Sequence, residues 1–125
     1  EGIALLKTAA IDKSAGNIEG LVSDAGKKIP LDGRSIDVCL MATVLHDFVE
    51  DKIDQEVLPE VVRVIQPDGI LAIMEFKKMD GPPGPPRHIR LSPEQVDELL
   101  APFGFKRAHY VEVGPHNYLM LFKLF

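Results

Sequence analysis

Apolar positions along the chain gather in short runs separated by polar turns, and the run at residues 35–41 is the centre of this pattern. It is almost wholly apolar, with a β-branched start at Ile36, and a turn-rich segment precedes it at residues 30–34. Such a run predicts a strand buried on both faces, as in a parallel sheet. Small and polar residues follow it from Ala42 to Asp47, at the carboxyl end, where open α/β sheets bind ligands.

The next segments predict a helix, a strand and a loop. Apolar residues recur at helical spacing from Val57 to Gln66. Pro59 is expected in the first turn of this helix, because an interior proline costs about 3 kcal/mol. A Pro-Asp-Gly turn then leads into Ile70–Phe76, which predicts a second buried strand. Lys77–Arg90 contains the run Gly-Pro-Pro-Gly-Pro-Pro and is expected to be a mobile loop.

The last third of the chain predicts a capped helix and a hairpin. Ser92 is expected as the N-cap, with Pro93 at the first helical position and Gln95 closing a capping box. Phe105–Val113 and Tyr118–Phe125 both predict strands, and four residues join them. A connection of that length favours an antiparallel hairpin.

The first quarter predicts two short strands whose spacing conflicts with a parallel pair. Thr8–Asp12 and Ile18–Ser23 each lead to an acid, Asp12 and Asp24. A parallel crossover needs about a dozen residues or more, whereas only five, Lys13–Asn17, separate these segments. Either the first segment is not a parallel strand, or the sequence has lost an internal piece.

Composition narrows the class of protein. The 125 residues suggest one domain, and contents of 46% hydrophobic and 26% charged residues are typical of soluble globular proteins. We find neither a membrane-length apolar run nor a signal peptide, and we expect a cytoplasmic protein. A net charge of −5 argues against a nucleic-acid partner. Cys39 is the single cysteine; it excludes an internal disulfide and is expected to be buried among apolar side chains.

Several short motifs together carry a family resemblance through their order and spacing. They are Ser23-Asp24-Ala25, Ile29-Pro30-Leu31, Ser35–Val38 with Val44-Leu45-His46, Val62–Gly69 before Ile70–Phe76, and Leu91–Gln95 with Leu99-Leu100 and Phe103-Gly104-Phe105. From Gly20 to its end the chain resembles the class I S-adenosylmethionine-dependent methyltransferases of the UbiE-like (type 11) group. Thr8–Ser14 is similar to the second strand of that family.

The resemblance implies an α/β fold, a Rossmann-like, doubly wound and mostly parallel sheet that ends in an antiparallel β-hairpin. Residues 1–125 would form a single methyltransferase-like domain. In the family, the first strand leads into an acid and a G-x-G loop, but none of the ten glycines here has another glycine two positions away. The fold is therefore expected without its first strand and adjoining helices. The family also has a helix after the strand similar to Thr8–Ser14, which favours a lost internal piece between Lys13 and Ile18.

The resemblance also implies cofactor contacts to S-adenosylmethionine. Asp12 would bind the ribose hydroxyls, as acids at strand ends do in dinucleotide folds. Asp24 would accept from the adenine amino group, with the Ala25 amide beside it, and Met41 and Ala42 would line the methionine part. The alternatives are an exposed acid or helix cap for Asp12, an Asx-turn for Asp24, and core packing for Met41 and Ala42.

His46 is the candidate catalytic residue, because it is a titratable group at the mouth of the expected site. It could act as general base on a hydroxyl or thiol of the acceptor, or it could orient the helix that follows it. Polar residues of the loop and hairpin would cover a substrate or would only be solvated: Arg87, His88, Arg90, Tyr110 and His116. No histidine spacing indicates a metal site.

The implied reaction is methyl transfer from the sulfonium of S-adenosylmethionine to an unidentified small-molecule acceptor. Because that methyl group is already activated, alignment of the nucleophile is the main task of the protein. One alternative is a methyltransferase-like interaction module without activity. Another is a receiver-like signalling domain, with Asp12, Thr43 and Lys77 as its phosphoacceptor set. A homodimer is an open alternative for the oligomeric state.

Overall fold

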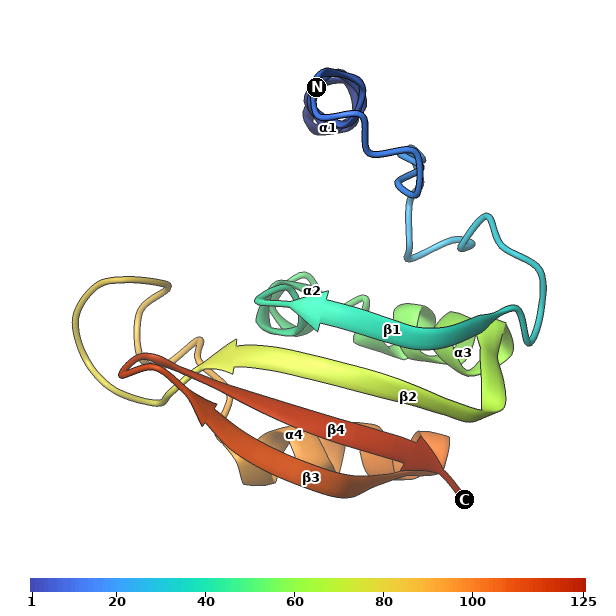
Figure 1. The fold of residues 1–125 in the computed structure, drawn as a ribbon. Helices are drawn as coiled ribbons and strands as arrows, with labels where there is room; N and C mark the ends of the chain where they lie inside the picture. The colour runs from blue at the N-terminus through green and yellow to red at the C-terminus, as the bar shows by residue number, and fades with distance from the viewer.

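A four-stranded mixed sheet with helices on one of its faces forms the body of the protein (Figure 1). The structure is a computed structural model that describes residues 1–125. In chain order the elements are α1 (Gly2–Asp12), β1 (Ile36–Ala42), α2 (Leu45–Glu50), α3 (Asp54–Val64), β2 (Ile65–Phe76), α4 (Pro93–Leu100), a 3-10 turn (Ala101–Phe103), β3 (Phe105–Val113) and β4 (Asn117–Leu124). None of the helices has the length and apolar character needed to cross a membrane.

The sheet has the order β1-β2-β4-β3, and only its first pair is parallel. β4 runs antiparallel to both β2 and β3, so the predicted C-terminal hairpin is confirmed. The expected α/β class with an antiparallel ending is also confirmed. β1 pairs with β2 alone, which leaves the other edge of β1 without a strand.

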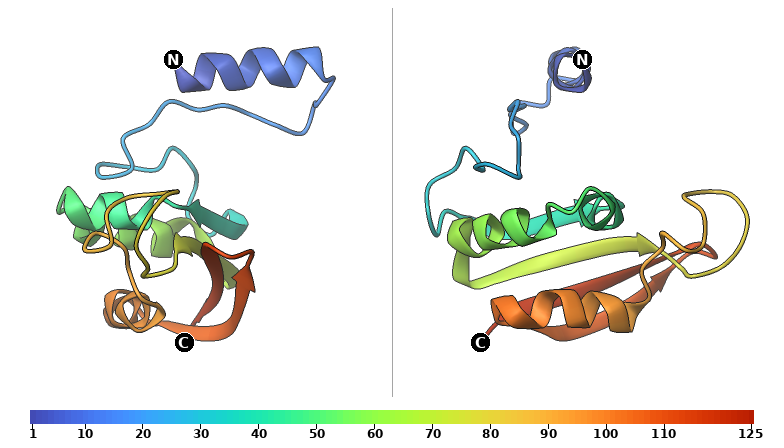
Figure 2. Two further views of the ribbon diagram at one scale, coloured as in Figure 1. Left: turned by 90° about the vertical axis from the view of Figure 1, so that its left-hand side faces the viewer. Right: turned by 180° about the vertical axis from the view of Figure 1, so that it is seen from behind.

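The core lies between the sheet and the helices α2, α3 and α4, which Figure 2 shows on a single face of the sheet. Alternate residues of each strand point into this layer because successive side chains of a strand face opposite ways. The contributing side chains are buried and apolar: Met41, Leu71, Ile73, Tyr118, Met120 and Phe122 from the sheet, and Leu45, Val57, Leu58, Val61, Val96 and Leu100 from the helices.

The opposite face of the sheet carries no helix of this chain (Figures 1 and 2). Val38 and Leu40 of β1 are 58% and 60% exposed there. The prediction that this strand is buried on both faces is therefore wrong for the chain by itself. The alternation of exposed and buried residues along β1 instead marks a strand covered on one side.

The N-terminal segment differs most from the sequence-based expectations. Thr8–Asp12 belongs to α1, not to a strand, and Ile18–Ser23 forms no strand either. The backbone continues without a break through residues 13–17, where the amide of Ala15 donates to the Ala10 carbonyl. The first of the two explanations therefore holds, because the first segment is not a parallel strand. The loss of an internal piece stays a prediction. The spacing was too short for a crossover because the first segment is a helix, rich in alanine and leucine.

Residues 24–34 attach this segment to the body through α3. The Ile29 amide donates to Oε1 of Glu60 at 2.8 Å, and the Arg63 guanidinium donates to the carbonyls of Leu31 and Ile29 at 3.0 and 2.8 Å. Arg63 also donates to Glu60. The side-chain hydrogen bond from Arg63, with that from the Ile29 amide, lowers the pKa of Glu60 to about 2. By contrast, no hydrogen bond joins residues 1–22 to the sheet or its helices.

Two prolines lie elsewhere than the sequence suggested. α3 begins at Asp54, so Pro59 is in its second turn and not in the first. Because proline has no amide hydrogen, the carbonyl of Gln55, four residues before Pro59, receives no hydrogen bond from it. Gln55 is exposed and lies near the start of the helix. α3 ends at Val64, and β2 starts at Ile65, so Pro67 lies inside the strand rather than in a turn before it.

The start of α4 is the local signal that the sequence encodes best. Ser92 accepts a hydrogen bond from the Gln95 amide, and the Gln95 side chain accepts one from the Ser92 amide. This reciprocal capping box satisfies two amide groups that a helix start otherwise leaves free. Gly104, with φ of 89°, then ends the 3-10 turn after α4 and leads the chain into β3.

Candidate functional site

Four segments meet at one end of the sheet: the carboxyl ends of β1 and β2, the loop after β2, and the β3–β4 turn (Figure 1). β1 leaves the sheet through Thr43, whose φ is 55°. The Thr43 amide donates to the Met74 carbonyl at 2.8 Å, and its hydroxyl donates to the Ala42 carbonyl at 2.7 Å. This left-handed turn closes the strand ladder and directs the chain into α2.

A buried pair of ionisable side chains lies immediately behind this end. Glu75 of β2 is fully buried, and His46 in the first turn of α2 is nearly so. His46 Nδ1 lies 2.8 Å from Glu75 Oε2, and the His46 amide donates to Oε1 at 3.0 Å. The carboxylate therefore fixes both the ring and the start of α2. His46 Nε2 faces the exposed carboxylate of Asp47 at 3.4 Å.

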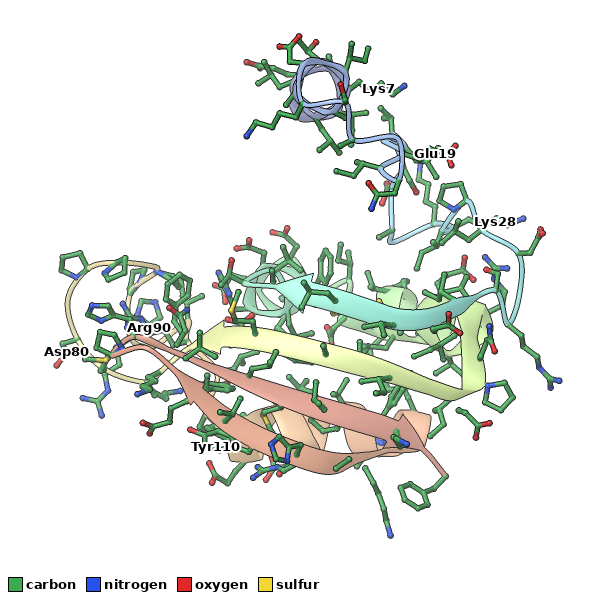
Figure 3. The ribbon with its side chains drawn as sticks, viewed as in Figure 1. Lys7, Glu19, Lys28, Asp80, Arg90 and Tyr110 are labelled. Atoms are coloured by element: carbon green, nitrogen blue, oxygen red, sulfur yellow. The ribbon has the colours of Figure 1, made fainter.

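The loop after β2 is held on the site by Arg90. The guanidinium donates to four carbonyls of the loop and lies over the Phe76 ring, with Cζ 5.6 Å from the ring centroid. The prediction of a segment without helix or strand is confirmed, while its expected mobility stays a prediction. Figure 3 shows Arg90 within the curve of this loop, not among the solvated side chains.

The structure places Asp24 and Ala25 in the connection before β1. Asp24 is exposed, and its Oδ1 accepts from the Gly26 amide at 3.0 Å, which is the Asx-turn given as the alternative. Its second carboxylate oxygen makes no hydrogen bond. Ala25 packs against the core cluster. Gly26 lies close to Ile53, because a Cβ built on Gly26 would be 3.6 Å from the Ile53 side chain. Asp24 is thus anchored to the body at the α2–α3 connection.

Met41 and Ala42 occupy the last two positions of β1 but face opposite ways. The Met41 side chain lies in the core, which was the alternative given for it. Ala42 points to the uncovered face and is exposed. Together with His46, they are the expected site residues that the structure gathers at one end of the sheet.

Asp12 is not part of this group. It is the last residue of α1, so the strand end on which its ribose contact was predicted does not exist. The receiver-like alternative is wrong for the same reason, because its phosphoacceptor acid has to follow a strand beside Thr43 and Lys77.

Several other candidate reactive groups have surroundings that bear on their chemistry. Cys39 is partly buried against the core, and burial raises the pKa of its thiol, so it is an apolar side chain as predicted. No group of three or more histidine, cysteine or acidic side chains is placed to hold a metal ion. Tyr110 stacks on Tyr118 with ring centroids 5.8 Å apart, and burial raises the pKa of Tyr118.

Glu75 was missed from the sequence, and Arg90 was named there only as a polar loop residue over the substrate or in solvent. Glu75 is the only charged residue in the apolar run of β2, and a lone acid in a buried strand requires a partner. That signal could have identified Glu75 as a paired group, although it does not identify His46 as the partner. Arg90 gave no comparable signal, because its four acceptors are backbone carbonyls of a loop whose path sequence does not fix.

Comparisons with known proteins agree on one family. A family model of methyltransferase domains matches residues 2–73. The UbiE ubiquinone/menaquinone biosynthesis C-methyltransferase of Campylobacter jejuni is 31% identical over an alignment of 86 residues, which covers 61% of this chain and 35% of that protein. The chain therefore spans about a third of this curated relative.

Solved structures extend the likeness to the whole chain. An S-adenosylmethionine-dependent methyltransferase from Aquifex aeolicus has a TM-score of 0.87 and 28% identity, over 98% of this chain and 63% of its own. The O-methyltransferase NcsB1, solved with S-adenosyl-L-homocysteine, has a TM-score of 0.80 at 14% identity, over 98% of this chain and 39% of its own. The [4+2]-cyclase SpnF also shares the fold, with a TM-score of 0.70 at 22% identity, over 89% of this chain and 41% of its own.

SpnF carries the same fold under the name of a cyclase, so the fold by itself does not define a reaction. The match of the family model covers more than half of the chain and does not depend on fold alone. The chain belongs to the methyltransferase-domain family, in the class I, UbiE-like group of S-adenosylmethionine-dependent methyltransferases.

Proposed function

We propose that the protein transfers the methyl group of S-adenosylmethionine to a small-molecule acceptor at the carboxyl end of β1 and β2, as one domain working in the cytoplasm. The observation that carries this proposal is the agreement with the Aquifex methyltransferase, which covers 98% of the chain at a TM-score of 0.87. The segments that agree include β1 and the Asp24 connection, where the cofactor residues are expected.

The residues present fit part of such a cofactor. Asp24 is exposed, is held in place by its bond to Gly26, and keeps one carboxylate oxygen free to accept from an amino group. Ala42 offers a small side chain at the open end of β1, and Met41 would contribute its backbone there. No G-x-G loop is present in the chain, so the proposal assigns no residue to the ribose.

The cofactor supplies an activated methyl group, and the chain has to align an acceptor with it and exclude water. We propose that His46 takes the acceptor proton through Nε2, because Nδ1 is held at 2.8 Å from Glu75. A carboxylate bonded to one ring nitrogen fixes the imidazole and favours proton uptake at the other. Asp47 is exposed and can turn away from Nε2 when an acceptor enters.

Calorimetric titration with S-adenosyl-L-homocysteine tests this function, after mass spectrometry has verified the chain. We expect binding that Asp24→Ala weakens about tenfold, as loss of one charge-assisted hydrogen bond requires. Asp68→Ala is the matched control. It removes the same charge from an exposed acid near the amino end of β2, and it should bind as the unchanged chain does.

Absence of binding by the 125-residue chain would refute the proposal for this molecule. Equal weakening by both variants would refute the role of Asp24 and indicate a general effect of charge. Absence of binding would favour the interaction-module alternative, since the uncovered face of the sheet exposes Val38 and Leu40 to a partner.

A further inference from the structure

Arg90 is a buried cation whose partners are carbonyls and not acids. It is 1% exposed, and no salt bridge joins it to a carboxylate. Its Nε, Nη1 and Nη2 donate to the carbonyls of Lys77, Gly81, Pro83 and Pro85 at distances from 2.6 to 3.1 Å. Only the planar, five-donor guanidinium can serve so many acceptors in fixed directions. Burial of such a charge without an acid indicates that the loop is built around it.

The loop held by Arg90, residues 77–89, rests on the ring of Phe76. A Cβ added to Gly84 would lie 2.8 Å from two ring carbons of Phe76, so the backbone of Gly84 touches the ring directly. The guanidinium lies over the same ring. Phe76 in turn packs edge-on against the His46 ring, with centroids 6.1 Å apart and an interplanar angle of 69°. One line of contacts therefore runs from the loop to His46.

A second contact anchors the loop to α4. Lys78 Nζ donates to the Arg90 carbonyl at 3.0 Å and to Gln95 Oε1 at 3.1 Å. Gln95 is the residue that closes the capping box of α4 with Ser92. The base of the loop is thereby fixed to a rigid helix start, while its tip is held through Arg90 and Phe76 and by an exposed ion pair of Arg87 with Asp80 at 3.6 Å.

We propose that Arg90 is a positioning residue for methyl transfer: it keeps the 77–89 loop closed on Phe76, and this closure controls access of acceptors to His46. The inference rests on the proposed function, because it takes His46 as the residue that receives the proton of the acceptor. The loop presents its backbone to Arg90 and Phe76, so its position depends on one guanidinium more than on its own side chains.

The experiment measures how fast diethyl pyrocarbonate modifies His46, by mass spectrometry of the intact chain and its peptides. His109, exposed on β3, is the internal control. Arg90→Ala should accelerate modification of His46 about tenfold, since it removes several hydrogen bonds that close the loop. His109 should react at an unchanged rate. Millimolar guanidinium should restore the slow rate in this variant, whereas methylammonium, which lacks the planar fork, should not.

A pair of glycine variants tests the same contact without changing Arg90. Gly84 and Gly81 have φ of 99° and 88°, so alanine is strained at both. Only at Gly84 does the added Cβ meet the Phe76 ring, because the space at Gly81 is open. Gly84→Ala should therefore expose His46 to the reagent more than Gly81→Ala does, because the two variants share the backbone strain and only Gly84→Ala disturbs the contact with the Phe76 ring.

Equal rates for His46 in Gly84→Ala and Gly81→Ala would overturn the proposal, and so would failure of guanidinium to slow the reaction in a folded Arg90→Ala chain. If Arg90→Ala does not fold, the glycine pair decides alone. These readouts need no cofactor, so they are independent of the titration with S-adenosyl-L-homocysteine. If the titration shows no binding and the modification rates change as expected, the proposed methyl transfer is refuted, but the role of Arg90 in closing the loop stands.

Discussion

The buried carboxylate of Glu75 allows a quantitative test of the structure. It accepts hydrogen bonds from the ring and the backbone amide of His46, and it has no exposure to water. Glu75→Gln keeps the shape but removes the charge, and a hydrogen bond to a charged group contributes about 1.5–3 kcal/mol. Glu75→Leu leaves two buried donors of His46 without an acceptor, which raises the expected loss to about 3–5 kcal/mol.

Urea unfolding followed by circular dichroism at neutral pH measures both losses. The matched control is Glu112→Gln, which makes the same chemical change in an acid that is 67% exposed and lies 3.3 Å from Lys77. An exposed pair of this kind contributes about 0–1 kcal/mol. Equal stability of Glu75→Gln and Glu112→Gln would refute the reasoning, and so would a Glu75→Leu chain no less stable than Glu75→Gln.

Three further variants have defined expectations. The pKa of Glu60 is lowered from 4.5 to about 2, so its contribution to stability is full above pH 4.5 and is lost as the pH falls toward 2; Glu60→Gln should flatten acid unfolding in that window. Ser92→Ala removes the cap of α4 and should cost about 0.5–2 kcal/mol in urea unfolding. Tyr118→Phe leaves the Leu91 carbonyl without its donor and should cost about 1–3 kcal/mol, while removing the later tyrosine step from an alkaline absorbance titration. A stability within error of the unchanged chain would contradict either of the last two expectations.

Elements that carry their own signals were predictable from the sequence. The start of α4 follows from Ser92 and Gln95, whose side chains and amides bond to one another within three residues. The β3–β4 hairpin follows from a short connection between two apolar segments. In both cases the deciding interactions are local, so no knowledge of the remaining fold is required.

The prediction of strands in the N-terminal quarter was wrong because a strand is defined by the strands that pair with it. Thr8–Asp12 has apolar residues and a final acid, as a strand of this family would, but alanine and leucine just before it continue into one helix. Ile18–Ser23 has the composition of a strand, yet no neighbouring strand pairs with it in this chain. The prediction that β1 is buried on both faces was wrong for the same reason, because covering its second face needs a layer that this chain does not provide.

The candidate site was predictable in place but not in detail. The carboxyl end of β1 was found from the transition between apolar and polar residues, and His46 and Ala42 do lie there. The partner of His46 comes from β2, 29 residues away, and that pairing depends on the register of Met41 with Ile73. Register of a parallel pair is a tertiary property and has no local signature.

The separation of α1 from the body has a thermodynamic consequence. None of its 11 residues is buried, and no side chain caps its start. Helices shorter than about 12–15 residues are marginal in water without tertiary packing, and they melt gradually as temperature rises. The ellipticity of the chain should therefore decline over a broad range before the sheet unfolds in one cooperative step. A single enthalpy fitted to the far-ultraviolet signal would underestimate the heat that calorimetry measures for the body.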